Sequence, residues 1–333
     1  VAITQTATVV VNPGTPANLN FVVQPASATS GASIAPAIQV EVRDALNNRV
    51  TTAANQVTLA ILNNAGGGTL SGTVTNVSPV SGVATFGNAS IDKAGTGYTL
   101  TATATGLTSA TSSAFNITAG AAAKISISAG DGQSATVNTN VATAPAVLVT
   151  DANGNPVAGV PVTFAIGVGG GSFSGTNPAT TNASGIATLT SWTLGTTAGA
   201  NTLTATATGF SGGGNPVTFT ATGTAGAATQ LVFTTQPTNT ANGQPISPTV
   251  VVTAEDAFGN TDHTYTGTVT MTIATDPNVV STLSGTTAPA AVAGVATFTN
   301  LAVNTLVPGG IGFKLGASDG TLTATSNSFN ITP

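Results

Sequence analysis

The segment Asp151-Ala152-Asn153-Gly154-Asn155 reveals how this chain is organised, because it occurs three times. It recurs as Asp44-Ala45-Leu46-Asn47-Asn48, 107 residues earlier, and as Asp256-Ala257-Phe258-Gly259-Asn260, 105 residues later. The units of a solenoid are only about 20–50 residues long, whereas a small domain that folds independently reaches about 100 residues. The spacing therefore predicts tandem copies of one domain.

Two further landmarks keep their order in each copy. The first is the triplet Leu70-Ser71-Gly72, Phe173-Ser174-Gly175 and Leu283-Ser284-Gly285, and the second is the pentapeptide at 82–86, 185–189 and 294–298. We expect three domains at residues 14–119, 120–225 and 226–333, preceded by an extra strand within residues 1–13.

The composition excludes several classes of partner. Only 5% of the residues are charged, with 5 Lys and Arg against 10 Asp and Glu, and the formal net charge is −5. Nucleic-acid binding needs clustered cations, so no nucleic acid is expected, and anionic membranes are excluded for the same reason. No apolar run reaches the ~18 residues that span a bilayer. Because 41% of the residues are hydrophobic, the chain is expected to fold rather than to stay disordered.

Apolar and polar residues alternate through most of the chain, as in Val57-Thr58-Leu59-Ala60-Ile61 and Val217-Thr218-Phe219-Thr220. A period of two is typical of a half-buried strand, and Gly and Pro interrupt the pattern every ten residues or so. About seven short strands per unit predict an all-β fold of three tandem immunoglobulin-like antiparallel β-sandwiches. In the second unit we expect strands near 123–128, 145–151, 161–167, 172–174, 185–191, 201–208 and 216–222.

The repeated Asp motif follows the second strand of each unit and is interpreted as a turn. Gly154 and Gly259 occupy a position that is expected to need a positive φ, and the first unit has Asn47 there, the non-glycine residue that tolerates this geometry best. The preceding Asp is expected to accept hydrogen bonds from turn amides. The alternative is a calcium site, which needs several oxygen ligands around one point. With one Asp per copy, the turn is favoured and no metal site is expected.

Further segments resemble a known family. Thr190–Gly195, followed by Ala198–Ala205, is similar to the end of bacterial immunoglobulin-like repeats of the invasin and intimin kind. Units one and three resemble a related bacterial group through Phe21–Pro25 and Phe233–Pro237, and through the endings Ala114–Thr118 and Ser328–Thr332. The resemblance covers nearly the whole chain and implies extracellular stalks, adhesins and fibre proteins. Because one fold serves many roles, it implies the fold more strongly than the function.

Residues 1–13 contain the apolar strand Thr6–Pro13, which is similar to the closing strands of units one and three but has no domain of its own. One interpretation is that the chain, which starts at Val1, is a segment of a longer array and that the strand belongs to a preceding unit. The other is that the strand is donated to a neighbouring molecule, since an exposed apolar strand favours aggregation.

No constellation of catalytic residues is found, so the predicted site residues are none: no catalytic, cofactor-binding or metal-binding residue and no cofactor. His263 is the only histidine and is interpreted as a solvated loop residue, although Asp262 and Tyr265 flank it. Lys124 is the one candidate for an intramolecular isopeptide bond, but its register places it toward water. Trp192 aligns by repeat with Ala89 and Leu301 and is interpreted as a core residue, with sugar stacking as the alternative.

These observations predict a non-catalytic structural protein, not an enzyme, that is an extracellular or cell-surface spacer, stalk or fibre subunit. Its expected partners are neighbouring copies of itself or adjacent repeats of a longer chain, and it could polymerise by donation of its N-terminal strand. The alternative is an adhesin or carbohydrate-binding module that recognises a host or cell-surface glycan or protein through the loops of one domain, such as Asp262–Tyr265.

Overall fold

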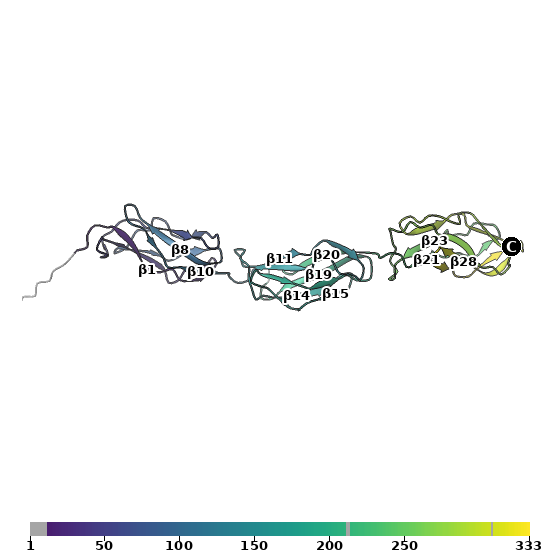
Figure 1. Ribbon diagram of the computed structural model, residues 1–333, viewed down its shortest axis with the longest axis horizontal. Coiled ribbons are helices and arrows are strands. Elements are labelled where there is room, and N and C mark those ends of the chain that lie inside the picture. Colours follow the sequence, from purple (N-terminus) through teal and green to yellow (C-terminus); the bar gives the residue numbers. More distant parts are fainter. Residues whose placement is uncertain (1–11, 211–213, 308) are drawn as a thin grey trace, which may run out of the picture.

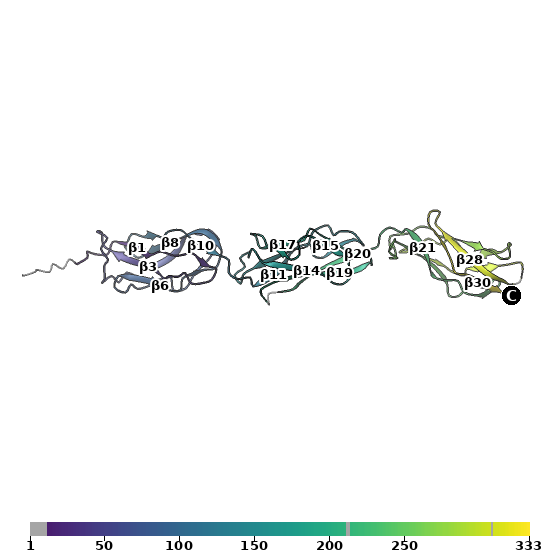
Figure 2. The ribbon, with the colours of Figure 1, turned by 90° about the horizontal axis from the view of Figure 1, so that it is seen from below.

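The computed structural model describes residues 12–210, 214–307 and 309–333 of the chain. These residues form strands and no helix, which confirms the all-β prediction. Figure 1 shows the strands gathered in three units that follow one another in a row, with the C-terminus at the far end of the third. A view turned by 90° shows the same row (Figure 2).

The strands are distributed evenly over the three units. Unit 1 contains β1 (Asn18–Val23), β2 (Ala28–Thr29), β3 (Ile38–Arg43), β4 (Thr58–Asn63), β5 (Leu70–Ser71), β6 (Val83–Phe86), β7 (Ser90–Ile91), β8 (Gly95–Thr103), β9 (Ala110–Thr111) and β10 (Phe115–Thr118). Unit 2 contains β11 (Lys124–Ala129), β12 (Gln133–Thr136), β13 (Ala146–Thr150), β14 (Pro161–Ile166), β15 (Ser172–Ser174), β16 (Ala179–Thr180), β17 (Ile186–Thr188), β18 (Ser191–Thr193), β19 (Gly199–Ala207) and β20 (Val217–Thr224). Unit 3 contains β21 (Gln230–Thr235), β22 (Thr240–Ala241), β23 (Val250–Glu255), β24 (Thr270–Thr275), β25 (Thr282–Ser284), β26 (Val295–Phe298), β27 (Ala302–Asn304), β28 (Gly310–Ser318), β29 (Thr323–Thr325) and β30 (Phe329–Thr332).

Each unit is a sandwich of two sheets. The smaller sheet has three strands, in the orders β1-β3-β6, β11-β13-β17 and β21-β23-β26. The larger sheet has the orders β2-β10-β8-β4, β12-β20-β19-β14-β16 and β22-β30-β28-β24, and β9 and β29 pair with β8 and β28. A short ladder accompanies each sandwich, formed by β5-β7, β15-β18 and β25-β27. This arrangement is immunoglobulin-like, as the strand pattern predicts.

One pairing in each unit differs from the purely antiparallel expectation. The short strands β2, β12 and β22 run parallel to the closing strands β10, β20 and β30. No crossover helix is needed, because the chain makes this pairing by passing from one sheet to the other. In unit 2, β11 pairs with β13 in the smaller sheet, and Gly130 and Gly132, both at positive φ, lead into β12 in the larger sheet.

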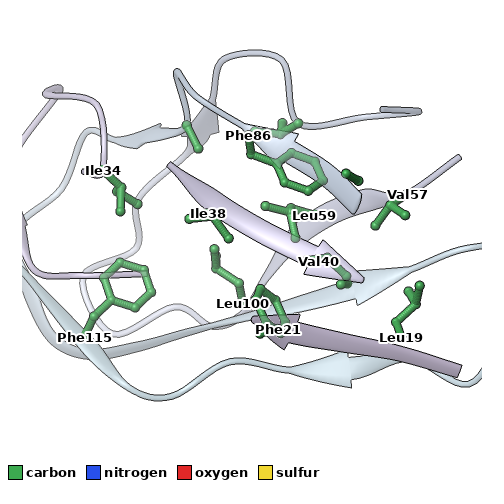
Figure 3. Close-up of a cluster of buried hydrophobic side chains, with 14 of the residues drawn as sticks. Leu19, Phe21, Ile34, Ile38, Val40, Val57, Leu59, Phe86, Leu100 and Phe115 are labelled. Carbon is green, nitrogen blue, oxygen red and sulfur yellow. The ribbon is translucent and has the colours of Figure 1, made fainter. Parts of the chain in front are cut away.

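The interior of each sandwich is filled by the apolar side chains of the alternating pattern. In β3, Ile38, Val40 and Val42 are buried while the residues between them are less so. Figure 3 shows Ile38 and Val40 packed with Leu59 of β4 and Leu100 of β8 in the core of unit 1. Each fully buried aliphatic side chain contributes about 1.5–3 kcal/mol. The buried residues form three separate clusters, each drawn from one unit, so the hydrophobic stabilisation of a unit comes from its own residues.

Candidate functional site: the joints between the units

The Asp of the repeated motif organises its turn through its carboxylate. In unit 2, Oδ1 of Asp151 accepts hydrogen bonds from the backbone N–H groups of Asn153 (2.9 Å) and Asn155 (2.8 Å), and Oδ2 accepts one from Nδ2 of Asn155 (2.9 Å). Asp44 and Asp256 accept the equivalent backbone hydrogen bonds in their own turns. The structure thus confirms the interpretation of the motif as a turn.

The backbone of the turn explains which residues occupy its fourth position. Gly154 and Gly259 have φ values of 81° and 83°, and Asn47 has a φ of 66°. These values lie in the left-handed region, where glycine has no Cβ clash and asparagine is tolerated. The predicted need for a positive φ is confirmed in all three units.

The same carboxylates hold the segments that lead into each unit. Oδ2 of Asp151 accepts a hydrogen bond from the backbone N–H of Gly120 (2.8 Å), which lies between units 1 and 2. Gly226 donates in the same way to Asp256 (3.0 Å), and Gly14 donates to Asp44 (2.8 Å). A buried acceptor about thirty residues away in sequence therefore fixes each linker to the body of the following unit.

Hydrogen bonding keeps these carboxylates ionised. The pKa of Asp44 is lowered to about 2, chiefly by the backbone N–H of Gly14 and then by the backbone and side chain of Asn48, which together outweigh the effect of burial. Burial raises the pKa of Asp151 and of Asp256, but the donors around each carboxylate outweigh it, so both values are lowered. A carboxylate that accepts several N–H bonds favours its charged form.

The last residue of the motif connects unit 2 to the end of unit 1. Nδ2 of Asn155 donates to Oγ of Ser30 (2.8 Å) and to the carbonyl of Asp92 (2.9 Å), and Oδ1 of Asn155 accepts from the backbone N–H of Ala94 (2.9 Å). Asn155 is buried. Because its amide uses both its donor and its acceptor, the side chain fixes two loops of unit 1 at once.

Other residues of this joint add to the same contact. Nδ2 of Asn153 donates to Oγ of Ser30 (2.7 Å), and Nζ of Lys93 donates to the carbonyl of Asn153 (2.5 Å). Gly31 has a φ of 75°, and a Cβ there would lie 2.8 Å from Nδ2 of Asn153. A side chain at position 31 would thus displace the amide of Asn153 from Ser30.

The joint between units 2 and 3 uses the equivalent asparagine in the same way. Nδ2 of Asn260 donates to the carbonyl of Thr196 (2.8 Å), and Oδ1 of Asn260 accepts from the backbone N–H of Ala198 (2.7 Å). The Asp of the motif was predicted to organise the turn, whereas no role in a joint was predicted for the Asn. The signal for it was present, since an asparagine ends the motif in all three copies at 48, 155 and 260.

A cavity of about 420 Å³ lies at the joint between units 2 and 3, and the loop around His263 forms part of its wall. The cavity is lined by Ala198, Gly199, Gly223, Thr224, Ala225, Asp262, His263 and Thr264. The carboxylate of Asp262 accepts hydrogen bonds from Ala228 (3.0 Å) and Thr264 (2.9 Å), whereas Nδ1 of His263 lies 3.2 Å from the carbonyl of Ala293. No hydrogen bond joins Asp262 to His263 in the part of the chain that the structure describes, so these residues form no acid–base pair.

The structure also places the remaining residues that the sequence singled out. Trp192 is 0% exposed, as a core residue should be, and this burial excludes stacking on a sugar. Its partner in the ladder is Phe173, and the matching ladder of unit 1 pairs Leu70 with Ile91. Trp192 therefore corresponds to Ile91 and, in unit 3, to Val303. Outside the ladder the predicted alignment with Ala89 and Leu301 holds, because the carbonyl of Trp192 accepts from the N–H of Val141 (2.9 Å) as those of Ala89 and Leu301 accept from the N–H groups of Ile34 and Ile246 (2.8 Å each).

Lys124 occupies a surface position, whereas the side chain of Glu41 is only 14% exposed. The exposed Lys124 side chain donates to the carbonyl of Ala152 (3.2 Å). Glu41 pairs with Arg43 (2.9 Å) and Arg49 (3.5 Å). In the described ranges no group of three or more His, Cys, Asp or Glu is arranged to hold a metal ion, and no helix is long and apolar enough to cross a membrane.

The fold and the joints define an all-β chain of immunoglobulin-like sandwiches connected end to end. No protein-family model and no curated protein sequence matches the chain. Among solved structures, it is similar to FdeC, an Escherichia coli adhesin, with 16% identity, 97% of this chain and 99% of that chain covered, and a TM-score of 0.42. InvD of Yersinia pseudotuberculosis is 15% identical over 93% of this chain and 96% of that one, with a TM-score of 0.43.

A third structure, of the bacterial integrin-binding protein invasin, is 16% identical over 93% of this chain and 59% of that chain, with a TM-score of 0.41. These likenesses concern the arrangement of β-sandwiches.

Proposed function

We propose that the chain is a non-catalytic structural array that acts as a spacer, stalk or fibre subunit at the cell surface or outside the cell. The observation that carries this proposal is the repeated joint. In both joints the Asp of the motif holds the linker and the Asn holds the end loops of the preceding unit. Two joints built from the same atoms favour a fixed angle between neighbours, which a spacer needs and a flexible tether does not.

The organisation into domains at 14–119, 120–225 and 226–333 is part of this proposal. It is supported by the three separate hydrophobic clusters, each of which lies within one of these ranges.

Small-angle X-ray scattering of the dilute chain tests the proposal. Three sandwiches in line should give a rod roughly 120 Å long, since a ten-residue strand extends about 33 Å. The double variant Ser30→Ala, Lys93→Ala removes side-chain contacts of the first joint and should lower the radius of gyration by increasing bending. A matched control is Asn182→Ala, which alters a turn of unit 2 whose side-chain hydrogen bonds stay within that unit. A wild-type chain that scatters as a broad distribution of bent shapes would contradict the proposal.

Donation of the N-terminal strand remains a proposal, because residues 1–11 lie outside the described residues. Each of the three sandwiches contains its own closing strand, β10, β20 or β30, paired within the unit. A donated strand would therefore add to a sheet edge rather than fill a missing position. Deletion of Val1–Asn12 tests this, since the mass of the assembly should fall if donation holds copies together.

The adhesin alternative places recognition on the loops of one domain. The loop that the sequence singled out, Asp262–Tyr265, lies beside the joint between units 2 and 3, where three of its residues line the cavity. Saturable binding of a glycan or receptor that is lost when this loop is replaced would favour the alternative over the spacer.

A further inference from the structure

The end of unit 3 carries apolar side chains that project into solvent. Val279 is 84% exposed and Leu306 is 85% exposed, and Val280 and Val307 beside them are about half exposed. These four residues are called the terminal patch below. They come from two loops, one between β24 and β25 and one between β27 and β28. A contiguous exposed apolar surface rimmed by polar residues is typical of an interaction site.

Hydrogen bonds hold the two loops of the terminal patch together. Nδ2 of Asn278 donates to Oγ1 of Thr305 (2.9 Å) and to the carbonyl of Gly309 (2.9 Å). The side chain of Asn242 accepts from the backbone N–H of Thr305 (2.8 Å) and donates to its carbonyl (3.0 Å). The exposure of the apolar side chains is therefore a property of an ordered, internally bonded surface.

The backbone of the terminal patch includes an unusual conformation. Val279 has a φ of 66°, and a β-branched residue rarely adopts the left-handed region. Residues in such conformations are frequent at binding sites, where the surrounding structure holds them in place.

The corresponding ends of units 1 and 2 are different in character. There the same two loops consist mainly of small and polar residues, with Gly66-Gly67-Gly68 and Asp92-Lys93-Ala94 in unit 1 and Gly169-Gly170-Gly171 and Thr196-Thr197-Ala198 in unit 2. Among the residues that the structure describes, the one large apolar side chain that is exposed there is Val168 of unit 2, against four in unit 3. Both of these ends contact the Asp motif of the unit that follows. The terminal patch thus occupies the position at which, in the other units, the next unit is bound.

The opposite end of the molecule offers a matching surface. The loop Asp44–Asn48 has the conformation of the loops that contact a preceding unit, and Oδ1 of its Asn48 accepts no hydrogen bond within the described residues. In Asn155 and Asn260 the same atom accepts an N–H from the neighbour. Leu46 occupies the third motif position and is 82% exposed, whereas Asn153 at that position reaches Ser30 of the preceding unit.

We propose that the terminal patch binds a second copy of this chain, with the loop Asp44–Asn48 of one copy docked on Val279 and Leu306 of the next. This inference rests on the proposed function as a structural array, which it extends from one molecule to several. Leu46 would be buried against the patch, and Asn48 would accept an N–H as its two counterparts do. The contact joins two different surfaces, so it does not close on itself and produces an open, head-to-tail row.

The size and chemistry of the two ends determine how this contact should behave. The four residues of the terminal patch are far fewer than the about 20–30 residues that each side of a stable interface contributes, so we expect weak, concentration-dependent association. Asp44 and Asp276 are occupied by hydrogen bonds within their own turns, which leaves mainly apolar contacts. Sodium chloride should therefore weaken the association little, and sulfate should strengthen it.

Engineered cysteines test the geometry directly, because the natural chain contains none. One variant carries Leu46→Cys and a second, labelled with ¹⁵N, carries Leu306→Cys. The two are mixed at high concentration under mild oxidation. Mass spectrometry then counts the mixed disulfide-linked dimer. We expect roughly ten times more mixed dimer than in the control mixture of Val80→Cys with Leu306→Cys, because the proposed contact places position 46 beside position 306 and so raises the effective concentration of the two thiols.

Val80 is a matched control for Leu46. It is 77% exposed and lies on a neighbouring turn of the same end. Its counterpart in unit 3, Val292, is also 77% exposed, although unit 3 is joined to unit 2. A preceding unit therefore does not cover this turn. Equal yields of mixed dimer in the two mixtures would overturn the proposal. So would association, measured by sedimentation, that Leu306→Asp leaves unchanged or that depends only on Val1–Asn12. Small-angle scattering from the dilute chain does not depend on association between copies. It therefore tests the proposed spacer function of a single chain independently of these outcomes.

Discussion

Replacement of Asp151 by alanine should destabilise unit 2 while leaving the other units folded. The carboxylate of Asp151 accepts hydrogen bonds from Gly120, from the backbone of Asn153 and from the backbone and side chain of Asn155. The two bonds from Asn155 are buried; without the carboxylate the backbone N–H has no acceptor, whereas Nδ2 keeps only Ser30 and Asp92. Water can replace the other two.

The two buried bonds set the expected magnitude. A hydrogen bond to a charged group contributes about 1.5–3 kcal/mol, so at the lower value the variant loses about 3 kcal/mol of unfolding free energy. For a domain of this size, 1 kcal/mol lowers Tm by about 4 °C. The unfolding of unit 2 should therefore shift downward by roughly 12 °C.

The fluorescence of Trp192 provides the assay, because it is the only tryptophan of the chain and lies in the core of unit 2. Thermal unfolding followed by this signal reports unit 2 alone, and calorimetry reports all three units. In Asp151→Ala the Tm reported by tryptophan fluorescence should fall. The calorimetric transitions of the other two units should keep their Tm. Asp44→Ala removes the equivalent carboxylate from unit 1 and serves as the matched control, which should leave the tryptophan transition unchanged.

A tryptophan transition in Asp151→Ala that coincides with that of the wild type would refute this reasoning. It would mean that the carboxylate organises the turn without stabilising the unit. Equal shifts in Asp151→Ala and Asp44→Ala would refute the separateness of the units instead.

Three further predictions concern titration and the core. Because the pKa of Asp44 is lowered to about 2 from 3.8, its contribution to the stability of unit 1 is present above about pH 4 and is lost as the pH falls toward 2. Calorimetry, or denaturant unfolding followed by circular dichroism, measures this loss over the same pH range. A stability of unit 1 that does not change with pH would contradict the prediction. The pKa of Tyr265 is raised to about 12 by burial and by its hydrogen bond to Asp319. Absorbance at 295 nm should therefore show a tyrosine titration near pH 12, and unit 3 should lose stability as the pH rises from about 10 to 12. In Tyr265→Phe the titration near pH 12 should disappear. Trp192→Phe removes a buried indole N–H that has no partner among the described residues, and an unsatisfied buried donor costs about 1–3 kcal/mol. The loss of unfolding free energy measured by calorimetry should therefore be well below the about 3–5 kcal/mol that truncation of a tryptophan costs. A loss of about 3–5 kcal/mol would contradict this reasoning.

Most of the fold could be predicted from the sequence because alternation directly encodes a half-buried strand. The expected strands at 161–167 and 172–174 coincide closely with β14 and β15. The turn at the Asp motif was also predictable, since the need for a positive φ at Gly154 and the acceptor role of Asp151 are local properties.

The features that could not be predicted depend on contacts between distant residues. The short strand β12 has little pattern of its own, and its parallel partner β20 lies about ninety residues away. The role of Asn155 was missed because its side chain acts on the preceding unit, and the sequence of one repeat carries no information about what its neighbour places beside it.

The parallel pairs between the first and last parts of each unit determine how the chain bears tension. A pull on the two ends of a unit draws β12 and β20 in opposite directions along their length, so all the bonds of the pair are loaded together rather than opened one by one. This pair joins four residues on each strand, whereas β2–β10 and β22–β30 join two. Under a steady pull, unit 2 should therefore be the last to rupture, and single-molecule force spectroscopy would show its unfolding at the highest force.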